Sequence, residues 1–156
     1  MSVDRVHRQE LTPLHFLERA GEVYAARTAV VDGASRFTFQ QMRDRARRLA
    51  SALRRDGLRK GERVAFLALN SEPLLVAHFG VPLAGGVLVA INTRLNAEEI
   101  SYIVEHSGAR MVFFSPDLAP LLARIPPQVK RLDLSRDWEA FLETGSADFI
   151  PPPVES

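Results

Sequence analysis

The chain has 156 residues, no cysteine, and a formal net charge of +1 from 20 basic and 19 acidic residues. This length suits one domain, and the lack of cysteine excludes a disulfide framework, a thiol nucleophile and a cysteine-based zinc site. The balanced charge gives no electrostatic basis for binding nucleic acid or an anionic membrane. The N-terminus lacks the apolar core of a signal peptide, and His78, Pro82 and three glycines interrupt the longest apolar stretch, residues 73–91. We therefore expect a cytoplasmic protein without a membrane span.

The first third of the chain predicts a short helix and a hairpin. Residues 1–11 are polar, and we expect them to be mobile. A helix is expected after Thr12, because threonine is a good N-cap and the proline that follows suits the first turn. Two short β runs, 28–31 and 36–38, flank the turn residues Asp32-Gly33-Ala34-Ser35. This arrangement predicts a β-hairpin.

Residues 39–56 carry apolar side chains at intervals of three and four, which predicts a helix. Thr38 suits its N-cap and Gly57 its C-cap. The opposite face is basic, with Arg43, Arg45, Arg47, Arg48, Arg54 and Arg55. A phosphate- or RNA-binding surface is one interpretation. A solvated helix face near a domain interface is favoured, because Asp44 and Asp56 interrupt the row and no aromatic residues interleave.

The middle of the chain alternates strands with helices. Three runs are apolar enough to be buried strands, at 63–69, 87–91 and 110–114. A helix is expected from Asn70-Ser71 to about Ala84, and a second begins at Asn96, where Glu99 completes a capping box. Strands that are apolar on both faces and alternate with helices predict a three-layer α/β fold with a parallel-type sheet and flanking helices.

The signal is weaker after Pro116. We expect a short helix over 118–125, a strand over 129–134, one helical turn over 138–142, and then a Pro/Gly/Ser-rich linker. The predicted division is a mobile N-terminus (1–11), an α/β subdomain (12–143) and a linker (144–156). A chain that ends in a linker suggests that a further segment follows.

The sequence shows no catalytic or metal-binding constellation. Its histidines are His7, His15, His78 and His106, and none is paired at the i, i+4 spacing of a helical metal site with a third ligand nearby. His78 lies in an apolar helix, so a packed or partly buried histidine is favoured over a base or ligand. His106 lies in the last turn before Ser107-Gly108, where a helix C-terminus accounts for it.

Three further motifs favour structural roles. The glycines in 80–86 leave a helix and enter a strand, whereas phosphate loops enter a helix. Glu98 and Glu99 point about 100 degrees apart on a helix and cannot face each other as an acid/base pair. Asn70-Ser71 is better explained as an N-cap than as a nucleophile, because no base is identifiable. We therefore name no catalytic, cofactor-binding or metal-ligating residue.

The chain resembles the N-terminal portion of AMP-forming acyl-CoA synthetases, within the adenylate-forming superfamily. The resemblance lies in three segments in a fixed order, residues 27–42, 49–73 and 78–114. The last is the most specific, and its Asn92-Thr93-Arg94-Leu95 is typical of carboxylic acid CoA ligases. The resemblance implies that this region is an incomplete N-terminal subdomain, in which Asn92, Thr93 and Arg94 form a structural loop.

For the complete protein, the resemblance implies a ligase that forms an acyl-adenylate from ATP and an acid and then transfers the acyl group to CoA, with magnesium beside the nucleotide. The phosphate-binding loop and the C-terminal domain with its lysine have no counterpart in these 156 residues. We therefore expect the chain alone to be inactive, to bind no cofactor, and to need the remainder of the ligase as its partner. Its exposed apolar surface is expected to cause self-association. The alternative is a naturally short, non-catalytic binding module on the same scaffold.

Overall fold

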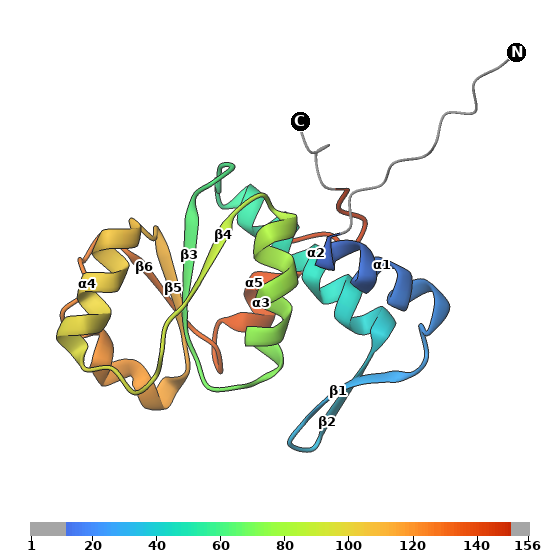
Figure 1. Cartoon of the computed structure of the whole chain (residues 1–156), viewed down its shortest axis with the longest axis horizontal. Helices are drawn as coiled ribbons and strands as arrows, with labels where there is room; N and C mark the ends of the chain where they lie inside the picture. The colour runs from blue at the N-terminus through green and yellow to red at the C-terminus, as the bar shows by residue number, and fades with distance from the viewer. Residues whose placement is uncertain (1–11, 151–156) are drawn as a thin grey trace, which may run out of the picture.

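The computed structural model describes residues 12–150, whose elements alternate between helix and strand along most of the chain (Figure 1). The helices are α1 (Pro13–Val23), α2 (Phe39–Arg55), α3 (Glu72–Leu83), α4 (Ala97–Ser107), the 3₁₀ helix η1 (Pro116–Leu122) and α5 (Trp138–Glu143). The strands are β1 (Thr28–Asp32), β2 (Ser35–Thr38), β3 (Arg63–Leu67), β4 (Val87–Ala90), β5 (Met111–Phe114) and β6 (Lys130–Asp133).

Four of these strands form a parallel sheet in the order β4-β3-β5-β6, which confirms the predicted three-layer α/β class. The two central strands, β3 and β5, are buried along nearly their whole length, as their continuous apolar sequence predicts. The prediction that residues 87–91 form a buried strand is wrong for most of that run. Within the described chain β4 pairs only with β3, and Val87 remains 48% exposed.

The sheet separates two hydrophobic clusters, because successive side chains of a strand point to opposite faces. Val64 and Phe66 of β3 face the cluster formed with α2, α3 and α5, whereas Ala65 and Leu67 face the one formed with α4 and η1. Figure 1 shows α4 on one side of the sheet and α2, α3 and α5 on the other, with α1 and the hairpin beyond α2. Trp138 meets Phe66 edge-on at a centroid distance of 6.2 Å and so closes the core beneath α5.

The capping box predicted at the start of α4 is confirmed, and Thr38, which was predicted only as an N-cap, forms a second capping box with Gln41. The Thr38 hydroxyl accepts the Gln41 N–H at 3.2 Å at the start of α2, and Asn96 Oδ1 accepts the Glu99 N–H at 3.0 Å at the start of α4. Thr12 occupies the N-cap position of α1, but its side chain makes no capping hydrogen bond within the described residues. Each box is built from residues three apart, so it can be read directly from the sequence.

The predicted hairpin forms from β1 and β2, which pair antiparallel. Helix α3 then crosses α2 so closely that a Cβ added at Gly80 would lie 2.8 Å from Leu49 Cδ2 and 2.9 Å from the Ala46 carbonyl oxygen. The glycine therefore permits the close crossing. No helix within residues 12–150 combines the length and apolar character that crossing a membrane requires.

Candidate functional site

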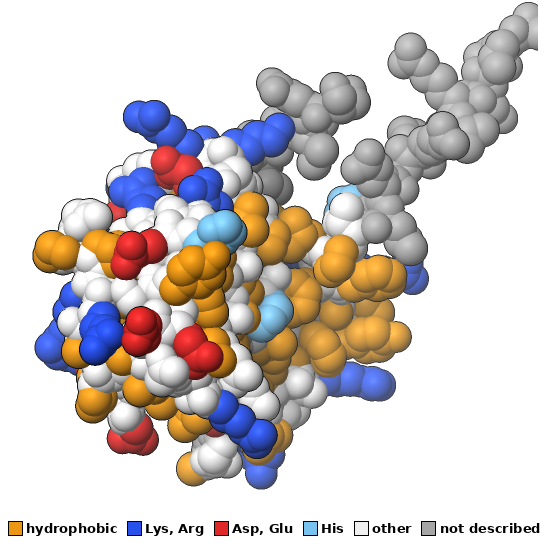
Figure 2. Space-filling model, turned by 60° about the vertical axis from the view of Figure 1, so that its left-hand side comes forward, with side chains coloured by type: hydrophobic (Ala, Val, Ile, Leu, Met, Phe, Trp, Pro, Cys, Tyr) orange, Lys and Arg blue, Asp and Glu red, His pale blue; other side chains and the backbone are white. Residues whose placement is uncertain are grey.

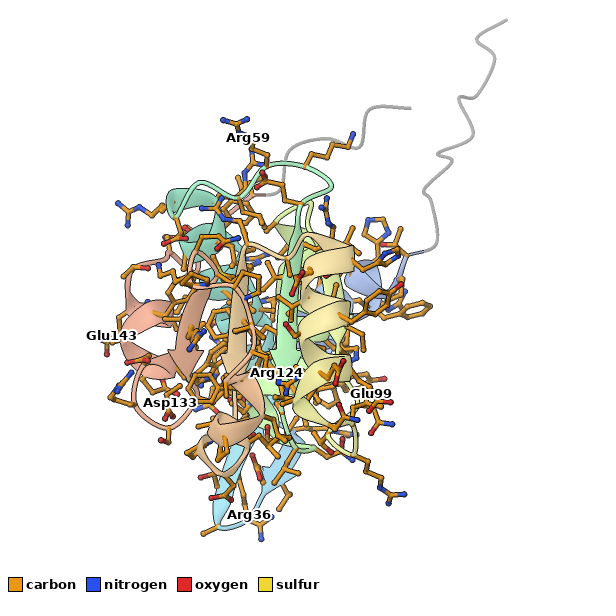
Figure 3. All side chains as sticks on the ribbon, turned by 90° about the vertical axis from the view of Figure 1, so that its left-hand side faces the viewer. Arg36, Arg59, Glu99, Arg124, Asp133 and Glu143 are labelled. Carbon is orange, nitrogen blue, oxygen red and sulfur yellow. The ribbon has the colours of Figure 1, made fainter. Side chains whose placement is uncertain are left out.

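The carboxyl edge of the parallel sheet is the first place to look for a site, because open α/β sheets bind ligands where successive connections run to opposite sides. Here the switch lies between β3 and β5, since β4 was added on one side of β3 and β5 on the other. In Figure 3, Glu99 and Asp133 lie toward the same end of the molecule as Arg36, at the tip of the hairpin, and Arg59 lies at the opposite end.

Polar groups at this edge are already used to hold its own loops. The Leu69 N–H donates to Ser115 Oγ at 3.2 Å and so ties the segment after β3 to the end of β5. In the loop after β4, the Arg94 N–H donates to Asn92 Oδ1 at 3.0 Å. The predicted structural role of Asn92 is consistent with this bond, which turns the chain toward α4.

The segment after β6 is held in the same way by two carboxylates. Asp133 Oδ1 accepts the Ser135 N–H at 2.8 Å, and Asp137 Oδ2 accepts the Asp133 N–H at 2.9 Å. The pKa of Asp133 is lowered, first by the hydrogen bond from the Ser135 hydroxyl. The pKa of Asp137 is lowered to about 2, first by the hydrogen bond from Arg136. Both are partly buried structural anions rather than acid/base catalysts, because neither would hold a proton near neutral pH.

The hairpin and α3 enclose a groove of about 340 Å³ on the surface beside this edge. We call it the hairpin–α3 groove, and it is lined by Val30, Val31, Asp32, Asn70, Ser71, Glu72, Leu74, Leu75 and His78. Its walls are mainly apolar, and its polar atoms gather at the N-terminus of α3.

Asp32 caps that N-terminus from the hairpin, with Oδ2 accepting the Glu72 N–H at 2.8 Å. Ser71 stands at the N-cap position as predicted, but its hydroxyl donates to the Leu69 carbonyl at 3.0 Å instead of capping the helix. A carboxylate at this place also complements the positive end of the helix dipole. The Asp32 carboxylate excludes the binding of another anion at the N-terminus of α3, because it already places a negative charge there.

His78, on the rim of the groove, is exposed, so the prediction of a packed or partly buried histidine is wrong. Its Nδ1 lies 2.7 Å from the Leu74 carbonyl oxygen one turn earlier on α3. The apolar sequence around it predicts burial only if all faces of α3 are covered, and this face is open.

Behind the groove, Arg45 of α2 holds two acidic side chains from distant parts of the chain. Its Nη2 donates to Glu72 Oε2 at 3.1 Å and its Nη1 to Glu139 Oε2 at 2.9 Å. The guanidinium also lies over the Phe37 ring, 5.2 Å from its centroid. One arginine thereby joins α2, α3, α5 and the hairpin.

The two carboxylates that share Arg45 have pKa values displaced in opposite directions. Burial raises the pKa of Glu72, which is 3% exposed, although the Arg45 hydrogen bonds oppose that rise. The Arg45 hydrogen bond lowers the pKa of Glu139, whose side chain is 66% exposed. The difference follows from desolvation, which penalises only the buried anion strongly. The indole N–H of Trp138 is buried and makes no hydrogen bond within residues 12–150.

The rest of the arginine-rich face also binds within the chain. Arg47 Nε donates to Glu18 Oε1 of α1 at 2.9 Å, and Arg48 Nη1 donates to the Gly145 carbonyl at 3.4 Å. Residues 144–150, at the start of the segment for which we expect a linker, therefore lie against α2, where a Cβ on Gly145 would be 2.1 Å from the Arg48 carbonyl oxygen. The expected solvated face is wrong for Arg45 and Arg47, whose side chains are partly buried ion-pair partners.

The remaining candidates lie apart from one another. His7 falls outside the described residues, and His106 stacks on Tyr102 on the outer face of α4 at a centroid distance of 5.5 Å. Glu98 pairs with Arg124 at 3.3 Å, while its neighbour Glu99 closes the capping box. Between residues 12 and 150, no three acidic or histidine side chains gather to hold a metal ion.

These residues do not fit ATP or magnesium, because the polar atoms at the sheet edge hold loops and a carboxylate caps α3. Sequence reasoning missed both Asp32 as the cap of α3 and the Arg45 network. No local signal marks either of them, because their partners lie far apart along the chain.

The AMP-binding enzyme family matches residues 17–153. Among curated proteins, 4-hydroxybutyrate–CoA ligase 2 of Metallosphaera sedula is 42% identical over 93% of this chain and 30% of its own length. Butyrate–CoA ligase AAE11, peroxisomal, of Arabidopsis thaliana is 40% identical over 74% of this chain and 20% of its own length. The chain thus spans less than a third of these relatives.

Solved structures give the same picture. A fatty acyl CoA synthetase of Mycobacterium tuberculosis superposes with a TM-score of 0.80 at 32% identity, covering 92% of this chain and 30% of that one. An anthranilate CoA ligase, AuaEII, solved with anthranoyl-AMP, superposes with a TM-score of 0.82 at 26% identity, covering 89% of this chain and 28% of that one.

Proposed function

The chain belongs to the AMP-binding enzyme family, and from that membership we propose that it is the N-terminal part of a carboxylic-acid CoA ligase. One observation carries the proposal: 93% of the chain aligns at 42% identity with a protein named as a CoA ligase. The chain spans only 20–30% of the first relatives, which supports a role as one part of a larger enzyme.

The proposed reaction of the complete enzyme joins an acid to CoA at the expense of ATP, with release of AMP and pyrophosphate and with magnesium accompanying the nucleotide. We assign no chemical step to a residue of this chain. Its role is to supply a packed α/β scaffold, and alone it is inactive. The polar groups of its sheet edge support this role, because they hold loops instead of facing a substrate.

The same proposal covers the domain division, the partner and the location of this chain. Residues 12–143 form the subdomain and residues 144–156 lead to the remainder of the ligase, which is the partner that this chain needs. Without that remainder, we propose that the chain self-associates through exposed apolar surface, because uncovered apolar patches favour association. A cytoplasmic location suits a chain without cysteine.

Two measurements test the proposal. The first reads the source gene beyond codon 156: a continuing frame with a Thr/Ser/Gly-rich loop supports it, and a stop codon favours the short binding module instead. The second places this chain in 4-hydroxybutyrate–CoA ligase 2 in place of the segment it matches. We expect this chimera to form acyl-CoA from ATP, CoA and 4-hydroxybutyrate, and the chain alone to form none. Acyl-CoA formation by the isolated chain would contradict its assignment as a scaffold.

A further inference from the structure

Helix α3 is apolar on every side, yet one of its sides faces solvent. Of its 12 residues only Glu72 and His78 are polar. The inner face, including Val76 and Val81, is fully buried against α2 and the sheet. On the outer face Leu75 is 39% exposed. A helix that is apolar all round is normally buried all round, so the outer face lacks its cover.

The hairpin extends this uncovered surface. Val31 of β1 is 56% exposed and lines the hairpin–α3 groove together with Leu75. The groove is open to solvent, and its walls are mainly apolar. Its polar end is already satisfied, because Asp32 accepts the Glu72 N–H and Glu72 pairs with Arg45. The open part therefore offers contact area rather than unpaired hydrogen-bonding groups.

The opposite face of the sheet differs. Helix α4 turns Glu98, Glu105 and His106 to solvent, and its one large exposed apolar residue, Tyr102, stacks on His106. In Figure 2, charged side chains are scattered over the α4 side, whereas hydrophobic side chains gather on the side that carries α1 and α3. The α4 side has a surface suited to water, and the α3 side has a surface suited to another protein layer.

We infer that the hairpin–α3 groove and the outer face of α3 are the docking surface for an apolar segment from the part of the ligase that this chain does not span. We call this docking surface the seat. The inference rests on the proposed function. It commits to that occupant because relatives continue for at least 70% of their length outside the match, and that length must pack somewhere. Contact between the apolar segment and Val31 and Leu75 removes their exposed area from water.

The isolated 156-residue chain gives the first test. Val31→Lys and Leu75→Lys place a charge in the seat without adding negative charge beside Asp32 and Glu72, and Tyr102→Lys on α4 is the matched control. We expect the wild type to bind an apolar dye and to self-associate in light scattering. Both signals should fall several-fold in the two seat variants and stay unchanged in the control. Dye binding and association that survive in both seat variants would overturn the inference.

The chimera with 4-hydroxybutyrate–CoA ligase 2 gives the second test, because there the seat should be filled. We expect each seat substitution to lower its melting temperature by several degrees and to reduce its soluble yield, while Tyr102→Lys changes neither. In the isolated chain the same seat substitutions should leave the melting temperature nearly unchanged. A residue of a docking surface should affect the melting temperature only in the chimera, where the surface is covered. A core residue would affect it in both the chimera and the isolated chain.

The outcomes separate the two proposals. An active chimera that tolerates both seat substitutions overturns the seat and leaves the proposed function standing. A chimera that folds, responds only to seat substitutions and forms no acyl-CoA supports the seat and contradicts the proposed function. A chimera that does not fold counts against the proposed function, and the isolated-chain measurements then decide the seat. A tight dimer abolished by Leu75→Lys, with a tolerant chimera, would identify a second copy as the occupant and overturn the inference.

Discussion

Helices α3 and α4 flank the same parallel sheet, but they are built on different principles. Helix α4 begins at a capping box made by its own residues, Asn96 and Glu99, and turns charged side chains outward. Helix α3 is apolar on all sides, takes its cap from Asp32 in the hairpin, and depends on Arg45 of α2 to neutralise its buried Glu72.

One face of the sheet is thus covered by a helix that is capped by neighbouring residues. The other face is covered by a helix whose cap and charge partner come from distant segments. Helix α4 is capped by neighbouring residues, and its ion pair with Arg124 lies exposed at the surface. The α3 face is held by ion pairs and close helix contacts between distant segments, and its outer surface is left open. The same kind of substitution should therefore lower the free energy of unfolding much more on the α3 face than on the α4 face.

Arg45→Met gives the largest expected effect, because it leaves Glu72 buried without its partner. Losing one member of a buried pair costs about 3–5 kcal/mol. On the α4 face the matched control Arg124→Met breaks an ion pair whose side chains are 64% and 82% exposed, and such pairs contribute about 0–1 kcal/mol. Urea unfolding of both variants measures the difference. Equal losses would remove the distinction between the faces.

Gly80→Ala should destabilise the protein although alanine is the better helix former. The added methyl would overlap Leu49 and the Ala46 carbonyl where α3 crosses α2. Overpacking costs about 1–3 kcal/mol, whereas an exposed helical Gly→Ala gains about 0.5–1 kcal/mol. Thermal and urea unfolding decide the sign. A stabilised variant would show that α2 and α3 cross less closely than described.

Asn96→Ala should cost about 1 kcal/mol, because its side chain accepts the N–H groups of Glu98 and Glu99. The equivalent change on α3, Ser71→Ala, should cost less, since the Ser71 hydroxyl bonds to Leu69 and caps nothing. Asp32→Ala should instead reproduce the loss on α3. Chemical denaturation of the three variants tests the assignment, and a Ser71 effect larger than that of Asp32 would reverse it.

The smallest expected effect concerns acid stability. The pKa of Asp137 is lowered from 3.8 to about 2, so its contribution is present above pH 3.8 and is lost as the pH falls toward 2. Asp137→Asn should therefore flatten the pH dependence of the free energy of unfolding in that window. Glu72, whose pKa is raised by burial, contributes with the opposite sign, because it favours folding more at low pH. A wild-type profile that the variant leaves unaltered contradicts the prediction.

Much of this architecture could be predicted from the sequence. Apolar periodicity located the helices and central strands, and the residues of both capping boxes, Thr38 with Gln41 and Asn96 with Glu99, stand three apart. The alternation of strand and helix led to the parallel α/β class. The prediction was wrong where an apolar run did not lie at the centre of the structure, as in β4 and around His78. An apolar sequence reports what a segment is able to bury, not which neighbours are present to bury it.

The sequence by itself determined the local elements and the capping boxes of α2 and α4, because those interactions join residues within one or two turns. Only the tertiary structure decided that Asp32 caps a helix 40 residues later, and that Arg45 binds Glu72 and Glu139 across 27 and 94 residues. It also decided which face of α3 stays open. Such contacts depend on how the layers pack after the chain has folded back on itself. No pattern of neighbouring residues shows which distant segments will meet.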